Sequence, residues 1–236
     1  MIDGEFAQAH RAFVEPPAFP TPRIYTSGYC EENVYNLLRM FIHQYPQWRA
    51  FAVFISNPTK SVAVWEQRAS SDPVSGRLVV WDYHVIAWLF PPSEDDRQQA
   101  DNGITTPNSS KRSWIYDMDS TLQQPCLARE YLSKTFKNQT ALELRWRSSF
   151  RIVSAGDYLE NFASDRSHML KNVGNTEEME YIAPVPPYDP IRGPLAQVSH
   201  NLMSDFVCME ARSFGVVAKN VTEAFEMALS LASVSE

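Results

Sequence analysis

The alternation of apolar and polar residues becomes regular from Ile24 onward and predicts a succession of helices and strands. In residues 30–43 apolar side chains recur every three or four positions, which predicts an amphipathic helix buried along one side. Residues 49–56 and 78–90 are almost continuously apolar, so we expect buried strands, with the longer one central in a sheet. Residues 61–67 resemble a strand that returns beside 49–56 in a hairpin. The same patterns predict strands over 114–119 and 150–154 and helices over 125–136 and 221–232.

Three stretches break this regularity. Residues 1–22 contain four prolines and predict an irregular N-terminal arm. Residues 91–112 are polar and predict a long exposed loop, and residues 171–194, with five prolines, predict a second irregular segment. The remaining pattern predicts one domain over residues 23–236, of the α+β class, because several antiparallel strands have helices to pack on them.

Composition narrows the choice of partners. The chain has 236 residues, 44% of them hydrophobic, which is enough for one sizeable core. Its net charge is −7 and it has no basic block, so we expect no nucleic acid partner and tolerance of a cationic ligand. The N-terminus lacks a leader pattern, and no apolar run approaches the about 18 residues of a membrane span, so we expect a protein made in the cytosol that contacts no membrane.

The three cysteines are odd in number, widely separated and form no CxxC pair. This spacing argues against a disulfide framework or a cysteine zinc site. The histidines show no HExxH or similar metal-ligand spacing, and the sequence has neither a P-loop nor a dinucleotide-binding glycine turn. We therefore expect no metal and no cofactor. The cysteines are Cys30, Cys126 and Cys208.

Cys30 stands out because the pattern places its thiol between a turn and a helix. Ser27 and Gly28 favour a turn, and the amphipathic helix begins at Cys30 itself. Free N–H groups and the dipole at a helix N-terminus favour a thiolate, so we expect a lowered pKa and a reactive sulfur. Glu31 and Glu32 oppose that shift while suiting the dipole. The alternative is a small buried core cysteine.

A cysteine nucleophile needs a base beside the sulfur and a third group that orients the base. In the strand expected over residues 78–90, alternation places Asp82 and His84 on one face. The same alternation places Trp81 and Tyr83 on the opposite face. His84 is therefore a candidate base that shares its face with a carboxylate.

Asp117 and Asp119 are candidates for orienting His84, because they share one face of the strand expected over residues 114–119. If that strand is the antiparallel neighbour of 78–90, an aspartate can reach the imidazole, since cross-strand spacings are about 5 Å. Alternation does not choose between the two carboxylates. The alternatives are a core histidine bonded to a backbone carbonyl and aspartates that cap the following turn.

Five short segments in unbroken order between Tyr25 and Met169 resemble the protein N-terminal glutamine amidohydrolase family. The resemblance continues more weakly at residues 186–188 and 201–214. Five separate matches in the correct order are specific, because such an order does not arise by accident. The matching segments are residues 29–33 (YCEEN), 52–57 (AVFISN), 80–85 (VWDYHV), 115–119 (IYDMD) and 161–169 (NFASDRSHM).

The resemblance implies an α-β-α sandwich with a mainly antiparallel central sheet, related to papain-like and transglutaminase-like enzymes. It implies a catalytic triad of Cys30 as nucleophile, His84 as base and Asp117 as the carboxylate that orients the base. The implied reaction converts the N-terminal glutamine of a protein or peptide into glutamate and releases ammonia through a thioester intermediate. It also implies a role in the N-degron pathway, as a monomer of the cytoplasm and the nucleus.

Selection of a chain terminus requires a partner for its α-ammonium, which a carboxylate supplies best. Asp82, Glu31 and Asp165 are the candidates, and each has a structural alternative as a cap or surface charge. Trp81 and Tyr83 are candidates for lining the substrate pocket, although aromatic residues in strands commonly belong to the core. Two other functions compete with amide hydrolysis: a related cysteine peptidase or transglutaminase, and a non-catalytic protein that binds N-terminal residues.

Overall fold

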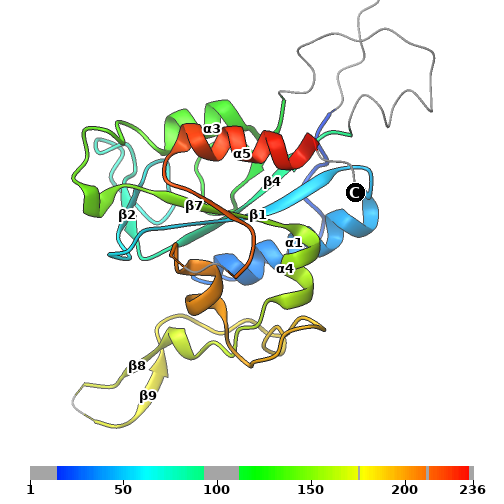
Figure 1. Cartoon of the computed structure of the whole chain (residues 1–236). Coiled ribbons are helices and arrows are strands. Elements are labelled where there is room, and N and C mark those ends of the chain that lie inside the picture. The colour runs from blue at the N-terminus through cyan, green and yellow to red at the C-terminus, as the bar shows by residue number, and fades with distance from the viewer. Residues whose placement is uncertain (1–14, 93–111, 175, 211–212, 234–236) are drawn as a thin grey trace, which may run out of the picture.

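A six-stranded antiparallel sheet forms the centre of the protein, in the order β10-β7-β1-β4-β5-β6. The structure is a computed structural model that describes residues 15–92, 112–174, 176–210 and 213–233. Helices α1 and α4 cover one face of the sheet, and α3 and α5 cover the other (Figure 1). The α+β class and the α-β-α sandwich are thus confirmed.

The described residues form one main sheet, two smaller sheets, four α-helices and three short helical turns. The sheet consists of β1 (Arg49–Ser56), β4 (His84–Phe90), β5 (Trp114–Tyr116), β6 (Cys126–Leu127), β7 (Ser149–Ser154) and β10 (Val216–Ala218). Two smaller sheets pair β2 (Val62–Val64) with β3 (Val79–Trp81) and β8 (Leu170–Asn172) with β9 (Met179–Tyr181). The helices are α1 (Cys30–Gln44), α3 (Ala128–Thr135), α4 (Ala155–Asn161) and α5 (Val221–Ser233), with short turns η1 (Leu144–Trp146), η2 (Ser167–Met169) and η3 (Leu202–Val207).

The sheet supplies two apolar layers because successive side chains of a strand point to opposite faces. On one face Leu38 of α1 and Phe54 of β1 belong to the same buried cluster. On the other face Trp88 of β4 packs with Tyr131 of α3 and Ala228 of α5. The two central strands, β1 and β4, are therefore buried almost throughout. No helix within the described ranges is both long and apolar enough to cross a membrane.

Four predicted elements are confirmed to within two residues at each end: α1, β1, β7 and α5. The predicted hairpin between residues 49–56 and 61–67 is wrong. β1 is flanked by β4 on one edge and β7 on the other, so it has no free edge for β2. β2 instead pairs with β3 in antiparallel orientation, and residues 65–78 connect the two strands.

The single strand expected over residues 78–90 is also wrong, because it divides into β3 and β4. Only β4 is central in the main sheet. At the break, the Asp82 carboxylate accepts a hydrogen bond from the N–H of Tyr83 at 2.9 Å, and the Asp82 carbonyl accepts one from the Ser56 hydroxyl at 2.7 Å. Such side-chain bonds compete with strand pairing for backbone groups. The break also ends the face alternation that the sequence predicted across Asp82.

Three further expectations are corrected in part. The strand over 114–119 ends at Tyr116, and the helix over 125–136 begins only at Ala128, after β6. Residues 171–194 were expected to be irregular but include the β8–β9 hairpin, which projects from the body in Figure 1. The predictions for residues 1–14 and 93–111 lie outside the described residues, and the division into an arm and one domain stays a prediction.

The described end of the N-terminal arm has no regular secondary structure but packs on the domain. Phe19 lies edge-on against Tyr116 with ring centroids 5.3 Å apart, and the Tyr116 hydroxyl donates a hydrogen bond to the Pro17 carbonyl. Because Tyr116 is fully buried, this contact anchors the arm over β5, next to the residues that follow β5.

Candidate active site

Cys30 is the first residue of α1 and is half-buried. Gly28 just before it has a φ of +84°, a conformation that glycine adopts without strain. The Asn33 side chain holds this turn, because its amide donates to the Thr26 carbonyl and accepts from the Thr26 N–H, both at 2.8 Å. The predicted turn and helix start around Cys30 are therefore confirmed.

His84 and Asp117 lie in direct contact, with 3.0 Å between His84 Nε2 and Asp117 Oδ1. Strands β4 and β5 are antiparallel neighbours, which is the arrangement on which the expected contact between an aspartate and His84 depended. Both side chains are buried. Burial lowers the pKa of the His84 imidazole, but the adjacent Asp117 carboxylate outweighs it and raises that pKa. Burial raises the pKa of Asp117, but His84 and its other donors hold it below the usual value.

Asp117 is held by more donors than His84 alone. Its Oδ2 accepts the Tyr131 hydroxyl at 2.7 Å and the Gln67 amide at 3.3 Å, and its Oδ1 accepts the Asp119 N–H at 2.9 Å. Both carboxylate oxygens are thereby fixed in place. An ionised carboxylate only accepts hydrogen bonds, so His84 Nε2 carries the proton and Nδ1 is left to accept one.

Trp81 stacks on the His84 ring, with centroids 6.0 Å apart and planes 16° apart. The sequence placed these two residues on opposite faces, and the break at Asp82 brings them together. The Trp81 indole donates to Gln67 at 3.2 Å, and Gln67 in turn donates to Asp117. Trp81 thus restricts the tilt of the His84 imidazole, and it is linked through Gln67 to the Asp117 carboxylate.

The Cys30 sulfur lies at the start of β4, next to the backbone of Val85, the residue that follows His84. The backbone N–H of Val85 points at the sulfur and lowers the pKa of the thiol. The predicted lowering of the pKa by the helix dipole is nevertheless wrong in its net effect. Burial and the Glu31 carboxylate raise the pKa of Cys30 well above its ordinary value, with smaller contributions from Asp119 and Asp82. The thiol itself donates to Glu31 Oε2 at 3.7 Å.

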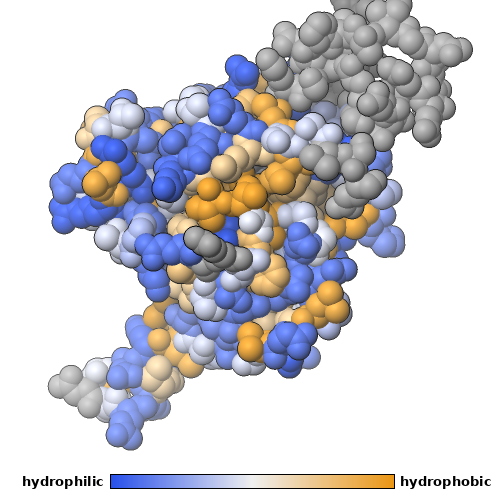
Figure 2. Space-filling view, viewed as in Figure 1, coloured by the Kyte–Doolittle hydropathy of each residue, from blue (hydrophilic) through white to orange (hydrophobic). Residues whose placement is uncertain are grey.

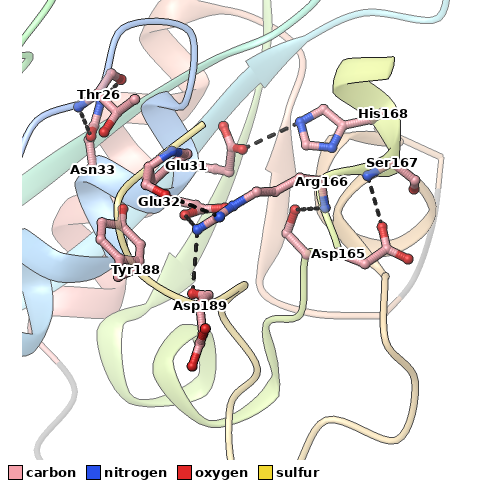
Figure 3. Close-up of polar contacts among 12 residues, drawn as sticks. Thr26, Glu31, Glu32, Asn33, Asp165, Arg166, Ser167, His168, Tyr188 and Asp189 are labelled. Carbon is pink, nitrogen blue, oxygen red and sulfur yellow. Dashed lines mark hydrogen bonds and ion pairs between the residues drawn. The ribbon is translucent and has the colours of Figure 1, made fainter. Parts of the chain in front are cut away.

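Glu31 lies fully buried beside the sulfur. Its Oε2 accepts the Tyr83 hydroxyl at 2.9 Å, and its Oε1 lies 3.4 Å from His168 Nε2. Figure 3 shows His168 directed at Glu31 from η2. Oε1 receives no hydrogen bond of good geometry from the described residues. Glu31 is thus a buried anion with capacity for one more donor.

The other two candidates for binding an ammonium group are placed differently. Asp82 is exposed and its carboxylate accepts the N–H of Tyr83. Asp165 is also exposed, and it caps the Ser167 N–H at 3.0 Å and lies 3.2 Å from His200 (Figure 3 shows the Ser167 contact). Of the three carboxylates, Glu31 is the one that accepts a hydrogen bond from the Cys30 thiol among the described residues.

A buried ion pair fixes the segment that carries His168. Arg166 donates to both oxygens of Glu32 at 2.8 Å (Figure 3), and Arg166 has a φ of +65°, in the left-handed region. The guanidinium also reaches the Asp189 carbonyl at 3.4 Å. The two parallel hydrogen bonds of this buried ion pair hold the segment of Arg166 in one position relative to α1. Removing either partner would leave an unpaired buried charge.

Several of these residues were not predicted from the sequence. Gln67 and Tyr131, which hold Asp117, occur singly and far apart in the sequence, so no periodicity or motif indicates a role for them. Glu32, Arg166 and His168 lie within two of the matched segments, residues 29–33 and 161–169. Those segments alone do not indicate that Arg166 pairs with Glu32 or that His168 lies next to Glu31.

Among the described residues, one group could hold a metal ion: His84, Asp117 and Asp119, whose ligand atoms lie within 4.8 Å of one another. His84 and Asp117 are already hydrogen-bonded to each other, and Asp119 accepts the Tyr25 hydroxyl at 2.6 Å. The hydrogen bonds account for this cluster without an ion, and the expectation of no metal and no cofactor stays a prediction.

A thiol at a helix start, beside an imidazole held by a buried carboxylate on an antiparallel sheet, is typical of cysteine hydrolases of the papain-like and transglutaminase-like class. Comparison with known proteins is more specific. The family of N-terminal glutamine amidases matches residues 25–227, and the chain belongs to this family. The resemblance found in the sequence is thus confirmed.

Relatives named protein N-terminal glutamine amidohydrolase occur in animals. The human protein is 36% identical over 201 residues, which cover 83% of this chain and 84% of the relative. The protein from Bos taurus is 34% identical over 212 residues, 89% of each chain. The protein from Drosophila mojavensis is 34% identical over 189 residues, 79% of each chain.

Proposed function

We propose that this protein hydrolyses the side-chain amide of an N-terminal glutamine, giving N-terminal glutamate and ammonia. Family membership and the names of the relatives support the reaction. The observation that carries the mechanism is the buried His84–Asp117 pair, next to a backbone N–H of Val85 that points at the Cys30 sulfur. We assign Cys30 as nucleophile, His84 as base and Asp117 as the group that orients the base.

The first half of the reaction forms a thioester. Because burial and Glu31 raise the pKa of the Cys30 thiol, His84 Nδ1 takes its proton as the sulfur attacks the carboxamide carbon. Free N–H groups in the first turn of α1 stabilise the resulting oxyanion. His84 then gives the proton to the departing nitrogen, and ammonia leaves. Asp117 stabilises the imidazolium while it exists.

The second half releases the product. His84 accepts a proton from a water molecule, whose oxygen attacks the thioester carbon. The carbon–sulfur bond breaks, Cys30 recovers a proton from His84, and the side chain leaves as the carboxylic acid of glutamate, which loses its remaining proton to the solvent. The same hydrogen bond from His84 to Asp117 keeps the imidazole in the correct tautomer in both halves.

Glu31 is the residue that we assign to the substrate α-ammonium. Its carboxylate is buried 3.7 Å from the Cys30 sulfur and has an oxygen that lacks a hydrogen bond. An ammonium group there would complete the hydrogen bonding of Glu31 and neutralise the charge that raises the thiol pKa. Binding of a free N-terminus would therefore make the sulfur easier to deprotonate. Trp81 and Tyr83 remain proposed lining residues of the glutamine pocket.

The test is mass spectrometry of peptides that differ only in the first residue, with detection of the mass increase from amide to acid. We expect conversion of Gln-initiated peptides, slower conversion of Asn-initiated ones, which a fitted pocket disfavours by about 1 to 3 kcal/mol, and none of N-acetylated ones. Equal rates on free and acetylated termini would refute the terminus requirement. Peptide cleavage or amine incorporation would instead indicate a peptidase or transglutaminase.

Two cysteine variants complete the test. Cys30→Ala should abolish ammonia release while the protein stays folded, whereas Cys208→Ala, at another half-buried free cysteine, should leave it intact. Binding of Gln-initiated peptides without turnover by the unmodified protein would indicate a non-catalytic reader. We further propose that the reaction serves the N-degron pathway in the cytoplasm and nucleus, and that the enzyme is monomeric.

A further inference from the structure

The β8–β9 hairpin is a two-stranded sheet, and among the described strands β9 has β8 as its partner on one side and an open edge on the other. β9 pairs with β8 in the register Leu170 to Tyr181 and Asn172 to Met179. No other described strand pairs with β9. All three residues of β9 are exposed. An exposed edge strand presents unpaired backbone groups to any extended chain that approaches it.

The backbone groups on this open edge can be identified. The N–H of Ile182 donates to the Met169 carbonyl at 2.9 Å, so Ile182 faces β8. Backbone groups of alternate residues in an antiparallel strand point to opposite sides, so Met179 and Tyr181 face outward. Outside the β8–β9 ladder, the described residues give neither of them a backbone hydrogen-bond partner.

The open edge begins beside the nucleophile. A Cβ placed on Gly28, two residues before Cys30, would lie 3.3 Å from the Cβ of Ala183 and 3.3 Å from the Cε of Met169. The chain that leaves β9 therefore packs directly against the turn that leads into α1. A polypeptide whose first residue occupies the site at Cys30 has this edge next to its path.

The surface here is apolar as well as open. Figure 2 shows apolar residues gathered where the hairpin joins the body. In monomeric proteins such edges are commonly protected by charge, twist or coverage. Here apolar side chains remain exposed along β9 and just after it. Their exposed fractions are 49% for Met179, 43% for Tyr181, 55% for Ile182 and 44% for Val185.

Resting on the function proposed above, we infer that the polypeptide following the N-terminal glutamine adds to the outer edge of β9 as a third, antiparallel strand. It enters beside Ala183 and runs toward Met179, opposite to the direction of β9. Main-chain hydrogen bonds to Tyr181 and Met179 supply affinity, and the exposed apolar side chains favour apolar residues in the substrate. The preferred substrates are thus extended, unfolded N-termini rather than termini buried in a folded domain.

The length of the β9 edge limits how many substrate residues can pair with it. Ala183 lies four positions after Met179, and a strand advances about 3.3 Å per residue, so the edge can follow roughly four substrate residues after the first one or two. For Gln-initiated peptides of two to ten residues, we expect kcat/KM to rise about tenfold up to roughly six residues and then level off, mainly through a lower KM.

The variant Tyr181→Pro tests the backbone contact. Proline removes the outward N–H of residue 181 and leaves the bonds to β8 in place. We expect the ten-residue peptide to fall to the kcat/KM of the dipeptide. Tyr181→Ala, which keeps the N–H, should retain part of the length dependence. Leu144→Ser, at an exposed apolar residue of η1, should retain all of it. Unchanged length dependence in Tyr181→Pro would overturn the inference.

A second measurement uses the unmodified protein, so it does not depend on the folding of any variant. Single N-methyl groups placed along a Gln-initiated peptide of eight residues should raise KM at alternate positions only, because every second N–H of the peptide faces β9. If the N-methyl groups raise KM at no position, or at positions that do not alternate, strand addition is overturned, provided that the dipeptide is still deamidated. Failure to deamidate any peptide overturns the proposed function itself, and the two failures are distinguishable.

Discussion

Two pairs of a histidine and a carboxylate flank Cys30, and they differ in how completely the carboxylate is bonded. In the first pair, Asp117 contacts His84 at 3.0 Å and has donors on both oxygens. In the second pair, Glu31 lies 3.4 Å from His168, and one of its oxygens receives no hydrogen bond from the part of the chain that the structure describes. Both carboxylates are fully buried or nearly so.

The difference indicates two separate tasks. A carboxylate with every acceptor site filled is held in one position and can in turn hold an imidazole, which suits Asp117. A buried carboxylate with an unfilled site is costly unless a donor arrives, which suits Glu31 as the partner of a cation. In the first pair, His84 begins β4 and Asp117 directly follows the neighbouring strand β5 of the main sheet. The second joins a helix start to a turn anchored by the Arg166–Glu32 ion pair.

Asp117→Asn should give the largest effect, because it removes the charge that fixes the His84 tautomer. We expect kcat to fall roughly a thousandfold to ten-thousandfold while KM changes little. Steady-state kinetics with a Gln-initiated peptide measures the loss, and near-UV circular dichroism checks the fold. A comparable loss appearing only in KM would place Asp117 in binding rather than in orientation of the base.

Glu31→Gln should have a smaller and different effect. It keeps the shape and the Tyr83 contact but removes the charge that we assign to the α-ammonium. We expect KM for Gln-initiated peptides to rise about tenfold to thirtyfold, since hydrogen bonds to charged groups exceed neutral ones by about 1 to 2 kcal/mol. Glu177→Gln, at an exposed carboxylate in the β8–β9 hairpin, serves as the control. No change in KM would assign the ammonium elsewhere.

Two matched tyrosine variants sharpen the comparison further. Tyr131→Phe removes one donor from Asp117, and Tyr83→Phe removes one donor from Glu31. Each should change activity about threefold to tenfold, since one hydrogen bond contributes about 0.5 to 1.5 kcal/mol. Tyr131→Phe should act on kcat and Tyr83→Phe on KM. The same parameter responding in both variants would show that the two pairs are not functionally distinct.

The pH dependence of thiol alkylation should show the smallest change. Because burial and Glu31 raise the pKa of Cys30 well above its ordinary value, the thiolate forms only toward alkaline pH, and alkylation by iodoacetamide should rise there rather than near neutrality. In Glu31→Gln the rise should move to lower pH, because a like charge beside the sulfur is removed. A plateau already reached near neutral pH would indicate a preformed thiolate and contradict proton transfer during attack.

Sequence reasoning located the first pair better than the second. His84 lies on a strongly apolar strand and Asp117 directly follows another, so the sequence could identify His84 and the two aspartates, Asp117 and Asp119, as candidates for the pair. The contact of Trp81 with His84 could not, because the break at Asp82 depends on hydrogen bonds from residues around it, including Ser56. Periodicity carries no information about such local competition for backbone groups.

From the sequence alone, hydrophobic periodicity determined the α+β class, the helix that starts at Cys30 and the apolar segments that contain His84 and precede Asp117, because it encodes which face of each element is buried. The family resemblance implied the sandwich and the choice of Asp117 over Asp119. The tertiary structure decided that Glu31 is buried against His168 and that the Cys30 pKa is raised rather than lowered. Those outcomes depend on desolvation and on charges far apart in the chain, which act only once the fold has brought them together.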